Sequence, residues 1–502
     1  MANWIDKAIG YVAPMSAVRR EQARAALAHL RAYDAAKTGR RTDGWRSSGA
    51  SANAEVNPSA ANARNRMREL VRNNPYANKA INILTAKKIG TGIRARPDAG
   101  AKPAWEEFVE NCDFEGQLDF YGIQAMLARA ADESGEVLVR RVRGTEGRVP
   151  LKLQVLEADY LDSSKFGPLS NGNYAIAGVE IDRLGRRQAY WMFDQHPGES
   201  LMLPRSLQSK RFEASEIVHL YEKLRPGQLR GIPRLAASML RLRDHDDWRD
   251  AVMMQKKIQA CFAAFVIGGS PNRPLGNAAT DATTGERTET MSPGMIDYIP
   301  LGTDVKFASP SPVGDGGEFS VAELHAIAAG GGLTYEQLTG DISRVNYSSI
   351  RSGMGDFKDM VEMWRWLTFI PMAMRPIWGW AMEAAWTAGN IRSPRYAVAR
   401  WTPPAWPYVN PVDDIKAAKE EIRGGIQSLS EKIRERGYDP DEVFEEIAKE
   451  RGTLAEKKIV VDTDAAVSNK AAPAVDGAAE PAKDDGGDKQ DKSKDKKESA
   501  AE

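Results

Sequence analysis

Apolar side chains recur at helical spacing between residues 62 and 88, where Met67, Leu70 and Val71 lie on one helix face. An Asn-Pro pair at Asn74 interrupts this pattern. Because the residue before a proline disfavours helical backbone, the segment predicts two consecutive helices. Residues 38–62 are rich in Gly, Ser, Ala and Asn, which predicts an extended arm before them.

Beyond residue 134 the pattern changes to short runs of Val, Ile and Leu between Gly-rich turns, which is typical of strands. Together with the helical segment 62–88 and a helix expected at 121–134, it predicts an α+β domain over residues 62–220. A separate helix is expected at 16–37, before the arm. The expected strands are 89–93, 136–142, 151–156, 175–181, 188–193 and 217–220.

The second half of the chain predicts long helices around an irregular segment. Pro233 opens a helical pattern that continues to about residue 260, since proline is favoured in the first helical turn. Ser320, with Glu323 three residues later, forms a capping-box pattern for a helix over 320–329. Other segments are predicted as follows: short strands at 295–299 and 305–307, a Met/Trp-rich helix over 349–388 kinked at Pro371 and Pro376, helices over 411–451, and a disordered tail from 465.

Charge and hydropathy change this picture in two ways. The most apolar stretch, residues 360–386, contains charged residues and prolines, so we expect no membrane span and no membrane partner. The formal net charge of zero hides an uneven distribution, because residues 1–96 have a balance of +12 and residues 411–464 one of −5. Such polarity suits a protein that meets nucleic acid or an acidic partner at one end. Two cysteines, Cys112 and Cys261, exclude a disulfide framework.

Catalytic motifs are absent from the sequence. It contains no Gly-Lys dipeptide for a phosphate-binding loop, no G-x-S-x-G elbow, and five histidines at least 23 residues apart. We therefore predict a protein that is not an enzyme, with no cofactor, no metal site and no catalytic residues. A large chain with long helices and a basic N-terminal third suggests a structural or assembly role.

Three features leave alternatives open. The acidic residues Asp132, Glu133 and Glu136 suit acid–base chemistry, but surface or interface charge is the stronger interpretation. His219 lies in a predicted strand and is interpreted as a hydrogen-bonded core histidine rather than a ligand. The seven tryptophans between Trp364 and Trp406 interleave with Met, Ile and Leu, which favours a core or subunit interface over a platform for stacking bases.

Several stretches, in order along residues 15–455, resemble the lambda-type family of bacteriophage portal proteins. The most specific is residues 219–231 (HLYEKLRPGQLRG), directly before the long helix. The others are residues 68–75 (RELVRNNP), 89–92 (IGTG), 105–113 (WEEFVENCD) with Phe120, Gly135 and Glu136, 178–182 (GVEID), 185–186, 189–191 (AYW), 196–198 (HPG), and a C-terminal pattern of Trp406, Asn410, Pro411, Lys416, Ala418, Ile422, Gly425, Ser428, Glu435, Gly437 and Asp439.

The resemblance implies a ring, usually of twelve subunits, at the portal vertex of the virion, assembled in the host cytoplasm. Double-stranded DNA passes through its channel during packaging and ejection. Terminase docks on it and head-completion proteins follow, while the major capsid protein and scaffold surround it. The implied parts are an N-terminal helix and arm (1–61), an α/β wing (62–231), a stem helix (232–267), an irregular clip (268–317), a second stem helix (318–339), a tunnel loop (340–348), a long kinked wing-spanning helix and strand (349–410), a helical crown (411–464) and the disordered tail (465–502).

Two groups of residues are predicted to contact partners. In the tunnel loop, Arg344 is the single cation, with Asn346, Tyr347 and Ser348 as neutral donors, which suits weak contact with a sliding polyanion. Its alternative is an ion pair with Asp341. The N-terminal basic residues Arg19, Arg20, Arg40, Arg41, Arg64, Arg66 and Arg68 are predicted to meet neighbouring subunits, capsid protein or DNA.

Two other classes of protein remain as alternatives. One is a different DNA-contacting phage connector or assembly protein, although such connectors are shorter than 502 residues. The other is a hydrolase built on the acidic cluster.

Overall fold

The computed structural model describes most of the chain. The described residues are 47–145, 147–199, 208–260, 316–343, 347–393, 399–408 and 410–461, the single positions Met15, Arg19, Asp43 and Gly44, and four short strands between 264 and 307. Apart from Arg19, which is helical, the predicted helix 16–37 lies outside these residues, as do the predicted strand 295–299 and the tail 465–502. Among the described residues, no helix is both long and apolar enough to span a membrane.

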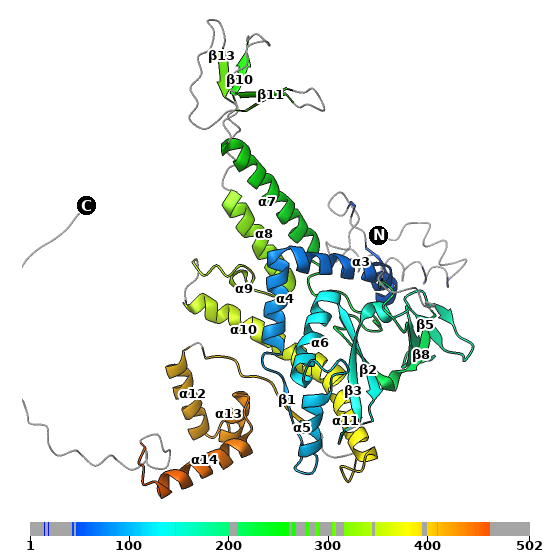
Figure 1. Cartoon of the computed structure of the whole chain (residues 1–502), viewed down its shortest axis with the longest axis vertical. Helices are drawn as coiled ribbons and strands as arrows, with labels where there is room; N and C mark the ends of the chain where they lie inside the picture. Colours follow the sequence, from blue (N-terminus) through cyan, green and yellow to red (C-terminus); the bar gives the residue numbers. More distant parts are fainter. Residues whose placement is uncertain are drawn as a thin grey trace, which may run out of the picture.

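Three helices, α3 (Ala52–Asn73), α4 (Pro75–Lys88) and α6 (Phe120–Ser134), pack against one another near the centre of the fold (Figure 1). The predicted break at Asn74 is confirmed, because its side chain accepts from the backbone N–H groups of Tyr76 and Ala77 and so begins α4. The prediction of an extended arm is wrong for residues 52–61. Ser51 caps α3, and Val56 and Ala60 are buried, so this stretch is already helical.

The central sheet has three antiparallel strands in the order β3 (Leu151–Glu157), β2 (Glu136–Arg143) and β9 (Ile217–Tyr221). One face of β2, with Val137 and Val139, packs in a core shared with α5 (Lys102–Asn111), α6 and the long helical rod described below. The opposite face, with Leu138, packs against a second sheet. The predicted strands 136–142, 151–156 and 217–220 are therefore confirmed.

The second sheet is a five-stranded antiparallel meander. Its order is β4 (Gly167–Pro168), β5 (Tyr174–Ile176), β6 (Val179–Ile181), β7 (Arg187–Met192) and β8 (Lys210–Glu213). The predicted single strand 175–181 is divided, because Ala177 and Gly178 adopt positive φ angles of 48° and 84° and turn the chain back on itself. Two short 3-10 helices connect the sheets: η2 (Ala158–Tyr160) lies between β3 and β4, and η3 (Ala214–Glu216) lies between β8 and β9.

A two-stranded sheet replaces the strand predicted at 89–93. Gly90 and Gly92 have positive φ angles and form a turn, and the strand begins only at β1 (Arg94–Arg96), which pairs with β14 (Arg400–Thr402). A Cβ on Gly92 would lie 2.2 Å from the ring of Tyr121, so the turn packs directly on α6.

Two helices project from the body of the molecule, α7 (Met239–Ala260) and α8 (Gly316–Gly331) (Figure 1). The predicted start at Pro233 is wrong, because residues 234–238 form turns, and the Arg234 N–H donates to the Asp132 carbonyl. The predicted start at Ser320 is also wrong: α8 begins four residues earlier. A capping box occurs instead at Thr334 and Gln337, where α9 (Tyr335–Thr339) begins.

The segment at the far end of these two helices contains two antiparallel strand pairs. They are β10 (Ala264–Ile267) with β13 (Asp304–Phe307), and β11 (Asn277–Thr280) with β12 (Arg287–Thr290). The prediction of a strand at 305–307 is confirmed, and the expectation of an irregular segment is wrong for these strands.

The Met/Trp-rich segment forms a continuous helical rod. It consists of α10 (Tyr347–Trp364), a π-helix η4 (Arg365–Met374) and α11 (Arg375–Thr387). Pro371 has no N–H to donate, and the rod passes it in wide π-helical turns. After β14 the chain forms α12 (Pro411–Arg423), α13 (Leu429–Glu435) and α14 (Pro440–Glu456), which we call the C-terminal unit.

Candidate functional site at the stem and its junctions

The projecting helices α7 and α8, called the stem, touch through a few specific contacts. Arg241 and Glu323 form an ion pair with an N–O distance of 2.8 Å, and His245 Nε2 lies 2.9 Å from Ser320 Oγ. The rings of Trp248 on α7 and Phe319 on α8 are 5.2 Å apart. Ser320 therefore joins the two helices and does not cap one of them.

Small residues let the stem helices meet closely at their base. Ser238 Oγ donates to the Ile327 carbonyl at 3.0 Å, and a Cβ on Gly330 would lie 2.0 Å from the same Oγ. A side chain at position 330 would push α8 away from the turn that leads into α7. The base of the stem is thus fixed, whereas the outer face of α7 is exposed, with Leu240 at 69% and Met254 at 58%.

A buried carboxylate anchors the segment that leads into the stem. Glu136, at the start of β2, is fully buried, and its oxygens accept from Arg230 Nε at 2.9 Å and Nη2 at 2.6 Å. The Gly231 N–H also donates to it at 2.9 Å, and His219 Nε2 lies 3.0 Å away. Arg64 of α3 approaches to 3.6 Å. Four separate segments of the chain therefore meet at one carboxylate.

The electrostatics of this cluster follow from its burial. Although burial alone raises the pKa of Glu136, the charge of Arg230 and the hydrogen bond from His219 hold that pKa far below its usual range. Burial lowers the pKa of His219 to about 4, against the opposing effect of Glu136. At neutral pH the cluster therefore holds a charged carboxylate, charged arginines and a neutral imidazole.

The backbone at the same place allows no larger residue. Gly135 has a φ of +87°, and a Cβ there would lie 2.4 Å from the Ile232 carbonyl carbon. A Cβ on Gly231 would lie 2.0 Å from the Gly135 oxygen. The backbone just before β2 and the segment that leads into the stem are thus in direct contact, which only glycine allows at these two positions.

A second buried pair joins the helices beneath the stem. Lys88 Nζ, at the end of α4, lies 2.5 Å from Asp132 Oδ1 of α6, and both side chains are buried. The same ammonium lies 4.2 Å from the centroid of the Trp364 ring. Burial lowers the pKa of Lys88, and the charge of Asp132 opposes that shift. Arg234, in the turn just before α7, forms an ion pair with Glu222 at 2.8 Å.

Arg365 links the helical rod to the end of α4. Its Nε donates to the Lys88 carbonyl and its Nη2 to the Lys87 carbonyl, both at 2.7 Å. The last carbonyls of a helix have no partner within it and bear partial negative charge, so a cation suits this place. Glu362 holds the guanidinium from the other side at 2.7 Å.

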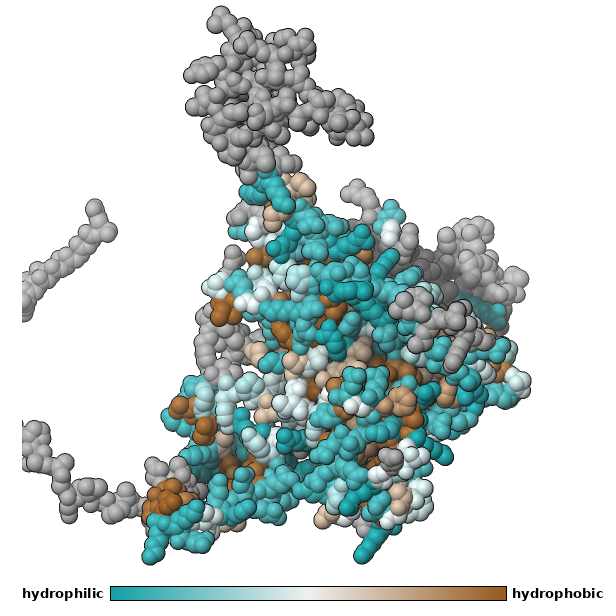
Figure 2. Space-filling model, viewed as in Figure 1, coloured by the Kyte–Doolittle hydropathy of each residue, from teal (hydrophilic) through white to brown (hydrophobic). Residues whose placement is uncertain are grey.

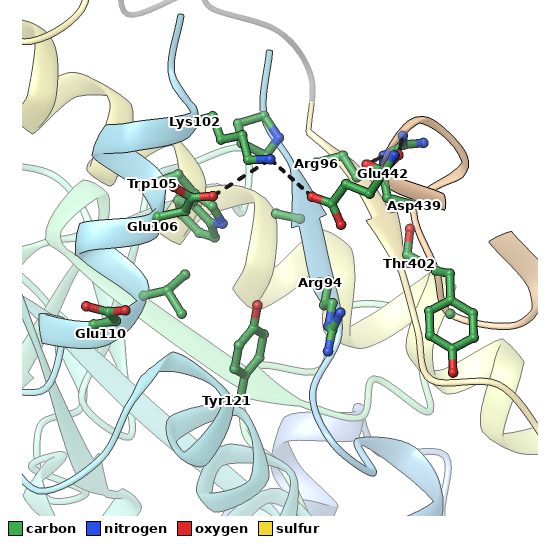
Figure 3. A pocket seen from close by; sticks show the side chains of 15 residues that line it. Arg94, Arg96, Lys102, Trp105, Glu106, Glu110, Tyr121, Thr402, Asp439 and Glu442 are labelled. Atoms are coloured by element: carbon green, nitrogen blue, oxygen red, sulfur yellow. Dashed lines mark hydrogen bonds and ion pairs between the residues drawn. The ribbon is translucent and has the colours of Figure 1, made fainter. Parts of the chain in front are cut away.

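The C-terminal unit meets β1 and α5 across a cavity of about 310 Å³ (Figure 3). Arg96 of β1 pairs with Asp439 and Asp441, and Lys102 of α5 pairs with Glu442 at 3.1 Å. The Arg436 guanidinium lies over the ring of Tyr408, in the segment between β14 and α12. The ion pairs therefore join the start of α14 to β1 and α5.

One cluster of potential metal ligands was not predicted from the sequence. Ligand atoms of Glu157, Asp159 and His196 lie within 4.8 Å of one another. Arg68 already pairs with Glu157 at 3.0 Å and with Asp159 at 2.9 Å. Because the guanidinium occupies the place that a cation needs, the cluster is a structural ion-pair group.

The predicted tunnel-loop residues are only partly described. Arg344 and Asn346 lie outside the described residues. Tyr347 and Ser348 form the first turn of α10, so the helix begins before the predicted loop ends, and their side chains lie outside the described part. Gly340 ends α9 with a φ of +80°. Asp341 accepts from the Ser343 N–H at 2.9 Å.

The predicted N-terminal contact residues divide into three groups: exposed, outside the described residues, and paired within the chain. Arg19 and Arg66 are exposed, and Arg20, Arg40 and Arg41 lie outside the described residues. Arg64 is 3% exposed and pairs with Asp159 at 2.9 Å, and Arg68 pairs with the same residue. For Arg64 the prediction of an outward contact is wrong, because acidic residues of the same chain neutralise it.

The main interpretation of the acidic cluster, surface or interface charge, is wrong for two of its three residues. Asp132 and Glu136 are buried in the two ion-pair clusters above, and Glu133 faces Arg129 at 3.4 Å. The interpretation of His219 as a hydrogen-bonded core residue is confirmed. So is the core role of the tryptophans for Trp364, Trp378, Trp380 and Trp401, whereas Trp366 and Trp386 are exposed.

Comparisons with known proteins point to one family. The model of the phage portal protein family of lambda type matches residues 38–365. A probable portal protein of Halomonas phage phiHAP-1 is 27% identical over 448 residues, which is 84% of this chain and 86% of that protein. Portal protein B of Escherichia phage lambda is 23% identical over 363 residues, covering 62% and 66%. A chain from the neck of a native gene transfer agent particle, solved with C12 symmetry, has a TM-score of 0.44 and 16% identity, covering 74% and 92%.

Proposed function

The chain belongs to the lambda family of phage portal proteins, a structural component of the virion, and from this membership we propose that its copies form a ring of twelve around a DNA channel. The observation that carries the proposal is the family match over residues 38–365, which contains the wing, the stem and the strands at its tip. The ring would occupy one capsid vertex and pass double-stranded DNA during packaging and ejection.

Because the stem projects from the body of the molecule, we propose that its far end and the body contact different partners. Strands β10 to β13 lie beyond the stem, and each pairs with a single neighbour among the described strands. A strand edge without a neighbour can pair with a strand of another chain. We assign this clip to docking of terminase and then of head-completion proteins. The exposed basic residues Arg19 and Arg66, with Arg20, Arg40 and Arg41, are assigned to contacts with neighbouring subunits, the major capsid protein, scaffold or DNA.

Imaging of the purified full-length chain tests the ring. We expect negative-stain images to show a ring with a central hole and rotational symmetry. Contacts between the copies would bury apolar side chains that are exposed in the single chain, such as Leu240 and Trp366. Images of a globular monomer at all protein concentrations would contradict the proposal.

The DNA-contacting element is assigned to residues 340–348. DNA carries one negative charge per about 1.7 Å, so a lining that permits sliding needs few cations. Replacing Arg344 by alanine is expected to change the length of packaged genome while altering stability by no more than about 0.5 kcal/mol. Asp341→Ala is the matched variant. Equal defects in both would indicate a loop-shaping pair, and wild-type packaging by both, with intact rings, would overturn the assignment.

A further inference from the structure

The C-terminal unit has almost no core of its own. Across the described residues of α12, α13 and α14, the one buried position is Pro440. Large apolar side chains remain exposed on its surface, and Figure 2 shows hydrophobic residues gathered over this part of the molecule. They include Val412, Ile415, Ile426, Leu429, Phe444 and Ile447. Three short helices without buried apolar area cannot account for their own stability, so this surface needs a partner.

One face of α12 combines apolar and basic residues. Val412, Ile415, Lys416 and Lys419 follow the spacing i, i+3, i+4 and i+7, which places them on one side of the helix. Val412 is 61% exposed and Ile415 is 45% exposed. Both lysines are exposed too. This face is therefore an apolar stripe with positive charge along it.

One face of α14 has the same spacing with the opposite charge. Val443, Glu446, Ile447 and Glu450 again stand at i, i+3, i+4 and i+7. Ile447 is 41% exposed, Val443 is half-buried, and both glutamates are exposed. This face is an apolar stripe with negative charge along it.

We propose that the α12 face of one copy packs against the α14 face of the next copy. Apolar positions at three- and four-residue spacing can interdigitate between helices, and charges beside them select the partner, as in coiled coils. Lysines on one face and glutamates on the other make the α12–α14 pairing favourable and the α12–α12 and α14–α14 pairings repulsive. The occupant of each face is thus a second copy of this chain, at its other face.

Two different faces meeting from copy to copy make a head-to-tail contact, and repeated rotation through such a contact generates a ring. The inference rests on the proposed function, because it specifies which surfaces join subunits in that ring. The ion pairs from Arg96 and Lys102 to residues 439–442 support it, since they hold the start of α14 against β1 and α5. Glu446, Ile447 and Glu450 of the α14 face stay exposed.

Charge reversal in the full-length chain tests the pairing. We expect Lys416→Glu with Lys419→Glu, and separately Glu446→Lys with Glu450→Lys, to raise the protein concentration for half-maximal ring formation at least about tenfold, measured by mass photometry. Combining all four changes in one chain restores opposite charges across the contact. We expect the combined variant to assemble within about threefold of wild type.

The control is Lys457→Glu with Lys458→Glu, which changes charge equally at exposed positions just after α14 and should leave assembly unchanged. Hydrogen–deuterium exchange of residues 410–461 in wild type, slower in rings than in subunits, is the second measurement. Normal assembly of both double variants, or equal exchange in rings and subunits, overturns this inference while the ring stands. If wild type forms no ring at any concentration, the proposed function fails, and the inference fails with it.

Discussion

Glu136→Ala is expected to lower the free energy of unfolding by about 3–5 kcal/mol, the usual cost of breaking a buried ion pair by removing one partner. The variant leaves Arg230 buried, at 2% exposure, without its carboxylate. It also leaves the Gly231 N–H and His219 without the oxygen that each now contacts. Urea unfolding of the full-length chain, followed by tryptophan fluorescence, measures this change.

Two further variants separate charge from shape at this position. Glu136→Gln keeps the volume and one acceptor oxygen, so a large loss in this variant too would assign the effect to charge. Glu110→Ala removes an exposed carboxylate and should change stability by no more than about 0.5 kcal/mol. If Glu136→Ala lowered the free energy of unfolding no more than Glu110→Ala does, the cluster would not anchor the segment that leads into the stem.

The pH dependence of the same cluster has a definite sign. The pKa of Glu136 is depressed in the folded chain, so its contribution is present above about pH 4.3 and is lost as the pH falls below that value. The pKa of His219 is about 4 in the folded chain, below its ordinary value of about 6.5. Between these two pH values the unfolded chain binds more protons than the folded chain. Stability therefore falls as the pH drops from about 6.5. We expect the difference between wild type and Glu136→Ala to narrow between pH 5 and pH 3.

Local patterns predicted much of the secondary structure. The break at Asn74 and the strands around β2 follow from capping chemistry and from runs of branched apolar residues. Such signals act over a few residues. Ser51 is an equally local cap, and it starts α3 ten residues before the predicted helix. The Ala- and Asn-rich stretch after it resembles a loop in composition, and only the burial of Val56 and Ala60 distinguishes it from one.

The anchoring cluster could not be predicted from spacing. Arg64, Glu136, His219 and Arg230 belong to four segments, and only the pairing of β2 with β9 brings Leu138 opposite His219 and so places Glu136 beside it. The same holds for Lys88 and Asp132, which are 44 residues apart. A charged residue in a sequence is most often exposed, so composition favoured surface or interface positions for Asp132 and Glu136. The core position of His219 was predicted from its strand, but its charged partners were not.

Asp132→Ala is expected to destabilise the chain by about 3–5 kcal/mol, because it leaves the Lys88 ammonium buried without its counter-charge. Trp364 supplies a π face at 4.2 Å, which offsets only part of that loss. Chemical unfolding at neutral pH measures the effect.

The double variant Lys88→Met with Asp132→Leu separates the cost of an unpaired charge from the worth of the pair. Both replacements are apolar and of similar size, and exchanging a buried pair for such residues is often neutral or stabilising. We expect the double variant to be at least about 2 kcal/mol more stable than Asp132→Ala. A double variant as unstable as the single one would show that the pair itself holds α4 against α6.

Titration gives an independent check on Asp132→Ala. Burial already lowers the pKa of Lys88, and loss of Asp132 removes the largest opposing effect, so the folded variant releases the lysine proton at a lower pH than the unfolded chain does. Stability then rises with pH up to the unfolded value of about 10.4, because a neutral amine is less costly to bury than an ammonium. The deficit of Asp132→Ala relative to wild type should therefore shrink between pH 7 and pH 9.5. A deficit independent of pH would mean that Lys88 stays charged through contact with solvent, and that the buried pair opens when Asp132 is lost.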